Sequence, residues 1–441
     1  MNLKSNFLEE FHARGFFAQC THEKELKELM VRESITAYIG FDCTAKSLHA
    51  GSLIQIMILR LLQKHGHKPI VLLGGGTTKI GDPSGKDEAR QVLTAEKIQE
   101  NLSGIKKTLE KFISFEGTNA AVLVNNDDWL KNLNYLDFLR DVGRHFSINR
   151  MLTFDSVKTR LEREQPLSFL EFNYMILQAY DFYELNKKLN CRLQIGGSDQ
   201  WGNIVNGVEL IRKKGIENFY QKIPKIRSQH QDRESYMEAS EKEFEKDFHQ
   251  ASFGLTSPLL TTADGKKMGK TADGAVWIDE TMLPAFDYFQ YFRNTHDADV
   301  GKFLRLFTDL EISEIENLEK LKDQEINKAK EILAFEATKI CHGGKTANEV
   351  LQKAREIFVA KNTAAFEEKK ISLGEEKNKK LVDIIFEIGA AESKGAAKKL
   401  IEGKGVKINN EAVLDVSHSI NNADSFDLSV GKKKFFKIIV S

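Results

Sequence analysis

The alternation of short β-rich runs with amphipathic stretches over residues 35–215 is the feature that most constrains the fold. The β-rich runs predict strands at Thr36–Phe41, Pro69–Leu73, Ala121–Val124 and Arg192–Ile195. Each run is followed by Gly, Asp or Asn and then by a helical stretch, a pattern typical of a parallel sheet covered by crossover helices. Open α/β sheets bind ligands at the carboxyl ends of their strands. The sequence therefore predicts an α/β fold with a nucleotide site at that edge.

Beyond the predicted sheet, the chain changes character several times. Residues 216–252 mix charges with little apolar periodicity, which indicates a peripheral insertion. From Pro284 to about Ala360, apolar residues recur at three- and four-residue spacing, which predicts helices.

The expected domains are a Rossmann-like catalytic domain over 1–255, a lysine-rich loop with an α-helical domain over 256–368, a charged linker at 369–380 and a small α+β domain over 381–441. In the last domain we expect helices at Leu381–Ile388 and Ser393–Glu402, then strands at Val406–Ile408, Ser425–Leu428 and Lys434–Val440.

The composition argues against several classes of protein. Among 441 residues, 64 Lys and Arg balance 64 Asp and Glu, so the overall charge indicates neither a nucleic acid nor a membrane as partner. A local basic face is still compatible with that balance. The four cysteines, Cys20, Cys43, Cys191 and Cys341, form no C-x-x-C pair, which argues against structural zinc and favours a reducing cytosol. We expect no resident metal and, without about 18 consecutive apolar residues, no membrane-spanning helix.

Three short motifs resemble catalytic signatures but do not match them. The glycine-rich stretch Gly74–Lys86 is followed by Asp87 rather than Ser or Thr, so it is not a Walker phosphate loop. Gly196–Gln200 lacks the final glycine of a nucleophile elbow. After His22, Leu26 occupies the position where a zinc protease needs its second histidine. These mismatches argue against acyl-serine and metallohydrolase mechanisms.

The segment Ser47–Ser52 is a candidate phosphate site, because it follows the first predicted strand and opens an apolar helix. A helix start presents backbone N–H groups and the positive end of the helix dipole, which suit an anion. Gly51 would let a nucleotide approach the backbone closely, and His49 could donate a hydrogen bond to a phosphate oxygen. A lone histidine at a helix start is more often structural, so this segment alone does not decide the function.

The lysine-rich loop Asp264–Thr271 is a second candidate, and its glycines leave it mobile. Mobile ammonium groups can close over a triphosphate and neutralise the charge that develops on the leaving group. The alternative is a solvated turn.

A polar stripe at offsets of three, seven and ten runs along an otherwise apolar helix and consists of Glu171, Tyr174, Gln178 and Asp181. A helix this apolar should be mostly buried, so the stripe faces either a polar pocket or a chance surface strip. Gln194, Asp199 and Gln200 surround the next predicted strand end, where a pocket on the sheet would receive them.

Taken in this order, these features resemble the tyrosyl-tRNA synthetases of bacterial type, a class I synthetase family, over nearly the whole chain. Ser47–Ser52 looks like the family's His-Ile-Gly-His signature, and Lys267–Thr271 looks like its Lys-Met-Ser-Lys-Ser loop. The resemblance is specific for the amino acid in four stretches, Tyr38–Asp42, Gly81–Lys86, Tyr174–Asp181 and Gln194–Trp201.

The resemblance implies a role for each matching residue. The phenol of a bound tyrosine would meet Tyr38 and Asp181. Its ammonium group would meet Asp82, Tyr174 and Gln178, and its carboxylate would meet Gln200. The implied ATP-binding residues, with Asp199 at the ribose, are Gly40, Asp42, His49, Gly51, Ser52, Asp199, Lys267, Lys270 and Thr271. The implied catalytic residues are His49, Lys86, Arg90, Lys267 and Lys270, and the last four would contact the pyrophosphate.

Residues 381–441 resemble a small RNA-binding fold first known from a ribosomal protein. The implied tRNA-binding residues are Lys394, Lys398, Lys399, Lys404 and Lys407. Their clustering after a linker favours RNA over a solvated face. Three departures from the family lie in the catalytic domain, and one is the segment 216–252, which is longer than in compact relatives. Ser52 replaces the second histidine of the signature, and Ile39 stands where many relatives have a cysteine that can contact the ribose.

The expected function is therefore ATP-dependent activation of L-tyrosine and its transfer to tRNA(Tyr) in the cytoplasm, with Mg²⁺ accompanying ATP. The family resemblance alone implies a homodimer. Two alternatives stay open, a synthetase-derived RNA-binding scaffold and an adenylating enzyme with an acceptor other than tRNA. The retained tyrosine pocket argues against the scaffold, and tyrosine-dependent ATP–pyrophosphate exchange followed by tRNA charging separates all three.

Overall fold

The computed structural model describes residues 7–82, 93–230, 232–248, 252–263, 265, 268, 270–271, 274–358, 366–373, 378–409, 411–421, 425–431 and 434–440. The chain forms two compact units, residues 1–343 and 344–441.

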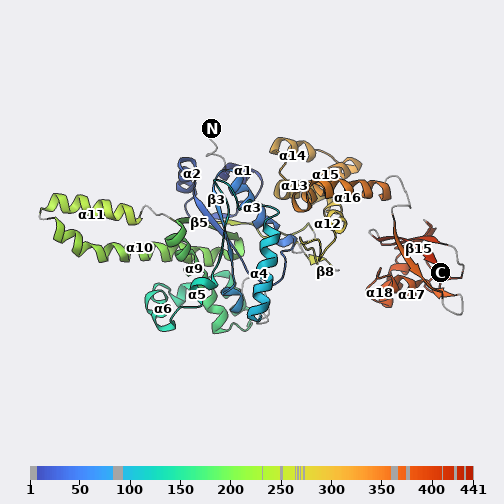
Figure 1. Cartoon of the computed structure of the whole chain (residues 1–441), viewed down its shortest axis with the longest axis horizontal. Helices are drawn as coiled ribbons and strands as arrows, with labels where there is room; N and C mark the ends of the chain where they lie inside the picture. The colour runs from blue at the N-terminus through green and yellow to red at the C-terminus, as the bar shows by residue number, and fades with distance from the viewer. Residues whose placement is uncertain are drawn as a thin grey trace. The chain divides into compact units, whose positions relative to one another are not determined.

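A sheet with the strand order β1-β6-β5-β2-β3-β4 forms the centre of the first unit (Figure 1). Its strands are β1 (Gln19–Cys20), β2 (Thr36–Phe41), β3 (Lys68–Leu73), β4 (Val122–Asn125), β5 (Cys191–Gly197) and β6 (Phe253–Ser257). All neighbouring pairs are parallel except the antiparallel pair of β1 with β6. The predicted parallel α/β sheet is therefore confirmed, and the four predicted strands correspond to β2, β3, β4 and β5.

Helices connect and cover these strands. Those up to β6 are α1 (Phe7–Ala13), α2 (Glu23–Arg32), α3 (Leu53–Lys64), α4 (Ala95–Leu109), α5 (Asp127–Leu130), α6 (Tyr135–Asp141), α7 (Ile148–Met151), α8 (Asp155–Glu162), α9 (Phe169–Leu189), α10 (Trp201–Gln229) and α11 (Arg233–Phe248). The central strand β3 is buried from Pro69 to Leu73, because crossover helices leave neither face of a parallel sheet to water. Helix α9 begins with a capping box, in which Ser168 and Glu171 satisfy each other's backbone N–H groups.

The predicted insertion at 216–252 is largely helical where the structure describes it. Helix α10 starts beside the sheet and continues to Gln229, and α11 runs back alongside its distal half (Figure 1). Phe219 and Phe244 meet edge to face with ring centroids 5.2 Å apart. The ammonium group of Lys222 lies 2.7 Å from a carboxylate oxygen of Glu243. Among the side chains described in residues 216–244 only Ile226 is buried, which explains why the sequence of this helical hairpin shows little apolar pattern.

The region predicted as helical from Pro284 contains α12 (Ala285–Arg293), α13 (Val300–Phe307), α14 (Ile312–Leu318), α15 (Ile326–His342) and α16 (Gly344–Phe358). Arg14, which follows α1, ties the start of the chain to this region. Its guanidinium donates to the carbonyl oxygens of Arg305, Thr308 and Leu310 at 2.9 to 3.1 Å. Because a buried guanidinium needs several acceptors, these contacts hold α1 against α13.

The second unit contains a sheet of strand order β12-β11-β14-β15-β9. Its elements beyond α16 are β9 (Glu367–Ile371), β10 (Lys379–Lys380), α17 (Leu381–Glu387), α18 (Lys394–Glu402), β11 (Val406–Ile408), β12 (Glu411–Ala412), β13 (Ser419–Ile420), β14 (Phe426–Val430) and β15 (Lys434–Val440). Strand β9 pairs in parallel with β15, so residues 369–371 of the predicted linker lie in this sheet. Charged side chains fill most of β9, as is common in edge strands, and only Ile371 enters the core.

Candidate functional site

A cavity of about 410 Å³ opens at the carboxyl ends of β2 and β5. The chain passes from β2 to β3 on one side, whereas β5 lies on the other side of β2, so the strand order reverses at this point. Crevices at such reversals are where open α/β sheets bind ligands. The predicted site residues that line the cavity are Tyr38, Gly40, Asp42, His49, Gly51, Ser52, Asp82, Tyr174, Gln178, Asp181, Asp199 and Gln200.

The other predicted residues of the catalytic domain and lysine loop are not tested by this cavity. Lys86, Arg90 and Lys267 lie outside the described residues. Lys270 and Thr271 form the short strand β7, which pairs with β8 (Gly274–Ala275), but the structure does not describe their side chains. The contacts that these residues make with a substrate stay predictions.

The deepest part of the cavity combines two buried polar side chains, Tyr38 and Asp181, each about 1% exposed. The hydroxyl of Tyr38 has no hydrogen-bond partner among the described residues. Asp181 accepts hydrogen bonds from Nδ2 of Asn126 at 2.9 Å and from Nε1 of Trp129 at 2.7 Å. Burial raises the pKa of the Asp181 carboxyl to about 7, and these two donors oppose the rise.

This part of the cavity is therefore built for a hydroxyl group. A buried hydroxyl without a partner is costly, and the chain keeps one at Tyr38. A carboxylate that is half ionised near neutral pH can accept a hydrogen bond from an incoming O–H group. A ligand hydroxyl placed between Tyr38 and Asp181 would satisfy both side chains.

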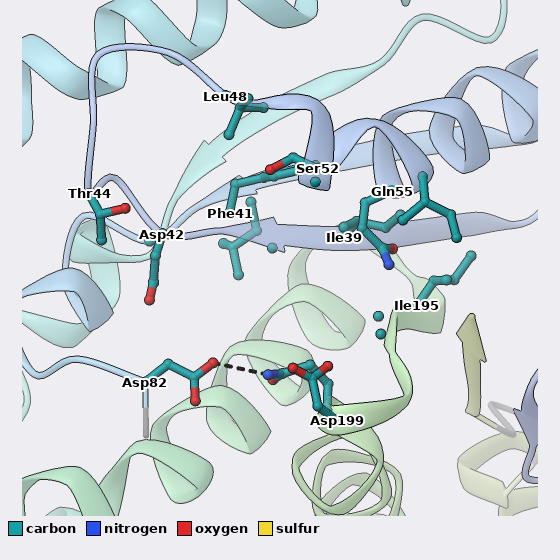
Figure 2. Close-up of a pocket in the computed structure, with 18 of the residues that line it drawn as sticks. Ile39, Phe41, Asp42, Thr44, Leu48, Ser52, Gln55, Asp82, Ile195 and Asp199 are labelled. Carbon is teal, nitrogen blue, oxygen red and sulfur yellow. Dashed lines mark hydrogen bonds between the residues drawn. The ribbon is translucent and has the colours of Figure 1, made fainter. Parts of the chain in front are cut away.

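The rim of the cavity carries a second polar network. Asp42 accepts hydrogen bonds from the hydroxyls of Tyr174 and Thr77 at 3.1 and 3.2 Å. Nε2 of Gln200 donates to Asp82 at 3.0 Å, and Figure 2 marks this contact opposite Asp42. Asp42 directly follows β2, whereas Asp82 lies on the chain between β3 and α4, and the two carboxylates make the cavity suitable for a cationic group.

An amide network continues from this rim into the start of α10. Nδ2 of Asn203 donates both to Oε1 of Gln178 and to Oε1 of Gln200, at 3.0 and 3.1 Å. These bonds occupy the amide oxygens of both glutamines and so fix the orientation of their side-chain amides. The amide nitrogen of Gln200 is thereby directed to Asp82. Asn203 was not among the predicted site residues.

The predicted polar stripe of α9 is only partly a site. Tyr174, Gln178 and Asp181 line the cavity, but Glu171 does not. Its carboxylate instead binds the buried guanidinium of Arg160 at 2.9 Å and caps the helix start. Helical periodicity places Glu171 on the same face as the three cavity residues. It cannot show that a carboxylate in the first turn is used to cap the helix instead of to line the cavity.

His49 caps a short 3-10 turn, Ala50–Ser52, that leads into α3. Its Nδ1 accepts the backbone N–H of Gly51 at 3.0 Å, so in the neutral ring the proton lies on Nε2. A Cβ on Gly51 would lie 2.7 Å from Cε1 of His49 and 3.0 Å from the carbonyl oxygen of Met268. Glycine is therefore needed at position 51, because a side chain there would collide with the imidazole ring of His49 and crowd the backbone of Met268. The sequence alone did not reveal this requirement.

The His49 segment is bonded to the chain that follows the lysine loop. The N–H of Ala50 donates to the carbonyl oxygen of Val276 at 2.7 Å, and the N–H of Ile278 donates to that of Leu48 at 3.0 Å. Between these bonds, the rings of His49 and Trp277 meet with centroids 6.2 Å apart. The His49 signature is thus joined to the chain a few residues beyond the predicted lysine signature.

Several residues of the site were missed by sequence analysis. Asn126 and Trp129 follow the end of β4, so a polar residue after a predicted strand was a usable signal for Asn126. Gln55 and Trp277 also line the cavity, and no sequence pattern indicated them. Thr44 lines it too and lies on the stretch of chain between Asp42 and Leu48 (Figure 2).

The predicted tRNA-binding lysines lie in the second unit, on α18 and just beyond it. All five are exposed, namely Lys394, Lys398, Lys399, Lys404 and Lys407. Lys394 is ion-paired with Asp383 of α17 at 2.7 Å. On the same helix Ala397 and Ile401 are buried in the core, so α18 turns its basic face to solvent.

Neither a candidate metal site nor a candidate membrane span is found among the residues that the structure describes. They contain no group of three or more His, Cys, Asp or Glu side chains arranged to hold a metal ion. Their helices include none that is both long and apolar enough to span a membrane.

Family models match both units of the chain. The model described as tRNA synthetases class I (W and Y) matches residues 30–359. The model described as Tyrosine--tRNA ligase SYY-like C-terminal domain matches residues 363–438. Together they span the catalytic sheet, the helical region and the small sheet.

Proteins of known name are similar along the whole length. A tyrosine--tRNA ligase of Wolbachia pipientis subsp. Culex pipiens (strain wPip) is 55% identical, over 100% of this chain and 99% of that protein. One from Ehrlichia ruminantium (strain Welgevonden) is 54% identical, over 100% and 99%.

Solved structures give the same likeness in three dimensions. A C-terminally truncated mitochondrial tyrosyl-tRNA synthetase of Aspergillus nidulans superposes with a TM-score of 0.65 at 29% identity, covering 80% of this chain and 94% of that one. The tyrosyl-tRNA synthetase of Archaeoglobus fulgidus, solved with L-tyrosine, has a TM-score of 0.53 at 17% identity over 78% and 99%, a likeness of fold alone.

Proposed function

The chain belongs to the tyrosine--tRNA ligases, a class I tRNA synthetase family, and we propose that its cavity carries out their two-step reaction. In the first step the carboxylate of L-tyrosine attacks the α-phosphorus of ATP, and pyrophosphate leaves. In the second step a terminal ribose hydroxyl of tRNA(Tyr) attacks the carbonyl of tyrosyl-adenylate, and AMP leaves. The buried pair of Tyr38 and Asp181 is the observation that carries the choice of tyrosine.

We assign the tyrosine phenol to this buried pair. The phenol O–H donates to Asp181, which already accepts from Asn126 and Trp129, and the Tyr38 hydroxyl donates to the phenol oxygen. A tyrosine bound in this way satisfies the orphaned hydroxyl of Tyr38. Phenylalanine would leave the Tyr38 hydroxyl without a partner and would offer Asp181 no further donor, and this is how a site built around a hydroxyl rejects an analogue that lacks it.

The other end of the amino acid would lie at the rim network. The ammonium group suits Asp82, Tyr174 and Gln178, and the carboxylate suits the amide of Gln200. Gln200 donates to Asp82 in the structure, and on the proposed function tyrosine binding exchanges this internal bond for two bonds to the substrate. The two new bonds compensate for the water that the ammonium and carboxylate groups of tyrosine lose on entering the cavity.

We place the triphosphate of ATP between the His49 segment and the lysine loop. His49 would donate from Nε2 to a phosphate oxygen, and Asp199 would accept from the ribose. Lys86, Arg90, Lys267 and Lys270 would neutralise the charge that develops on the leaving pyrophosphate. Mg²⁺ would enter with ATP, because this ion is held mainly by phosphate oxygens and water.

An exposed apolar surface supports a homodimer. Tyr135, Leu136 and Ile148 are 58%, 74% and 64% exposed, and Phe169 is 69% exposed. A hollow of about 380 Å³ lies beside them, lined by Leu130, Leu133, Tyr135, Phe138, Leu139, Phe169 and Leu170. Apolar patches of this kind mark contacts with other proteins.

Sedimentation equilibrium should give twice the chain mass, and a monomer at micromolar concentration would contradict the dimer.

A cytoplasmic location follows from the substrates and agrees with the described cysteines, all of which are free thiols.

The assignment is tested by tyrosine-dependent ATP–pyrophosphate exchange, followed by charging of total tRNA with labelled tyrosine. Both activities are expected, and chelation of Mg²⁺ should remove both. Exchange without charging would favour an acceptor other than tRNA. The loss of both activities in a folded protein would leave only the RNA-binding scaffold.

Replacing Asp181 tests the phenol site through its pH dependence. The ionised carboxylate accepts the phenol O–H, and its pKa is about 7, so tyrosine affinity should rise as the pH increases from 5.5 to 8.5. In Asp181→Asn this rise should vanish. Tyrosine binding should weaken by about 10- to 100-fold at high pH, since a hydrogen bond to a charged group contributes about 1.5–3 kcal/mol.

Equilibrium dialysis with labelled tyrosine measures both effects. The matched control is Tyr38→Phe, which removes a neutral hydroxyl from the same pocket and should keep the pH dependence. An unchanged pH profile in Asp181→Asn would remove Asp181 from the phenol site.

The basic face of α18 predicts a salt-dependent contribution to tRNA binding. Lys398 and Lys399 are exposed there, and each phosphate contact adds somewhat less than one unit to the slope of log affinity against log salt. Replacing both lysines with alanine should therefore lower the slope by about 1.5 and leave exchange unchanged. The control replaces Lys369 and Lys370 of β9, which removes the same charge elsewhere in the second unit. Equal slopes for wild type and the α18 variant would show that these lysines only face solvent.

A further inference from the structure

Helix α4 packs against Cys43–Ser47, the segment that joins strand β2 to the His49 signature. The side chain of Asn101 is fully buried, and its Nδ2 donates to the carbonyl oxygen of Cys43 at 2.8 Å. Four residues further on the segment, the hydroxyl of Ser47 lies 3.2 Å from the hydroxyl of Thr108. The helix thus holds the segment at both ends.

The contacts on α4 come from one face of the helix. Asn101, Gly104 and Thr108 are spaced by three and four residues, which places them in a row. Glu100, beside this row, is ion-paired with Lys46 in the middle of the segment. A docking stripe therefore runs along the helix from Glu100 to Thr108.

Gly104 allows the closest approach in this stripe. A Cβ built on it would overlap the carbonyl oxygen of Lys46 and would lie 3.3 Å from the Cα of Lys46. Both atoms belong to the backbone, so neither can rotate away as a side chain would. Glycine is an unfavourable residue inside a helix, which makes the contact itself the reason for its presence here.

The segment that α4 holds also lines the cavity. Thr44, Ala45 and Ser47 contribute to the wall next to His49, whereas none of the α4 stripe does. The other anchor of the segment is the hydroxyl of Thr78, which accepts the N–H of Cys43 at 2.8 Å. The tyrosine-specific pair lies elsewhere, on β2 and α9, and has no bond to α4 among the described contacts.

We propose that Gly104 and Asn101 are positioning residues for the activation step. They set the position of the Cys43–Ser47 segment, and through it the position of His49 against the phosphates of ATP, without touching either substrate. The inference rests on the proposed function of the cavity. It predicts that damage to the stripe slows adenylate formation and spares tyrosine binding.

The test compares Gly104→Ala and Asn101→Ala in the full-length chain. Alanine at 104 favours the helix but pushes against the Lys46 backbone, and alanine at 101 leaves the Cys43 carbonyl without its donor. The matched control is Ser103→Ala, an exposed position on the same helix. Tyrosine affinity is measured by equilibrium dialysis, and the rate of adenylate formation is measured in single turnovers at saturating tyrosine over a range of ATP concentrations.

Both variants should form adenylate about 10- to 100-fold more slowly, because a displacement of about 1 Å at a reacting group has an effect of this size. Their tyrosine affinity should stay within about twofold of wild type, as should every property of Ser103→Ala. Should Gly104→Ala fail to fold, Asn101→Ala decides alone.

Two results would overturn the proposal. Wild-type rates in a folded variant would show that the stripe does not position the segment. A loss of tyrosine affinity in proportion to the loss of rate would show a general disturbance instead. A wild-type chain that lacks adenylate formation altogether would contradict the proposed function, so the two failures can be told apart.

Discussion

The pairing of Leu48–Ala50 with Val276–Ile278 is the contact on which the site depends. These segments lie more than 220 residues apart in the chain, yet two backbone hydrogen bonds join them on either side of His49 and Trp277. One segment opens α3 at the end of β2, and the other follows the lysine loop. Because backbone bonds fix position more firmly than flexible side chains do, the loop returns to the sheet at a defined place. The chain that follows the lysine loop therefore keeps a fixed register to His49.

Burial performs the corresponding task in the amino-acid pocket. Asp181 of α9 is buried, and the loss of hydration raises the pKa of its carboxyl. Hydrogen bonds from Asn126 and Trp129 oppose this rise and keep the pKa at about 7. An Asp in water would be ionised and satisfied by solvent, and it would gain little from a phenol. In this pocket Asp181 has only the donors Asn126 and Trp129 among the described residues, and a ligand hydroxyl would add a third. On the proposed assignment of the phenol, discrimination against phenylalanine follows from the Tyr38 hydroxyl, which is buried without a partner among the described residues.

Much of this arrangement could be predicted from the sequence because it follows local patterns. Strands β2 to β5 are apolar runs bounded by turn residues, and helical spacing placed Tyr174, Gln178 and Asp181 on one face. Pairings between distant segments carry no such pattern, so the contact of Trp277 with the His49 segment and the donation of Trp129 to Asp181 appeared only in three dimensions.

Edge and surface elements were also hard to predict. Strand β9 consists mostly of charged residues, as an exposed edge strand can, and its composition therefore resembled a linker. The α10–α11 hairpin buries only a narrow seam, so its helices show little amphipathic period. The sequence shows Gly51 and Gly104 but not why glycine is needed there. The backbone carbonyls that a Cβ at these positions would approach belong to Met268 and Lys46, which lie on other segments.

The central claim, that backbone pairing couples the histidine segment to the lysine loop, can be tested at Ala50. Proline suits the backbone here, because Ala50 is the first residue of a helical turn and His49 before it is extended. It lacks the N–H that donates to Val276, and its ring would press against that carbonyl oxygen, so the substitution breaks the pairing. The measurement is the single-turnover rate of tyrosyl-adenylate formation in Ala50→Pro, with Ala50→Gly as the control that keeps the N–H, alongside tyrosine affinity in both. The account predicts that the proline variant loses about 10-fold or more in rate at unchanged tyrosine affinity, while the glycine variant behaves like wild type. Equal rates in the two variants would contradict it.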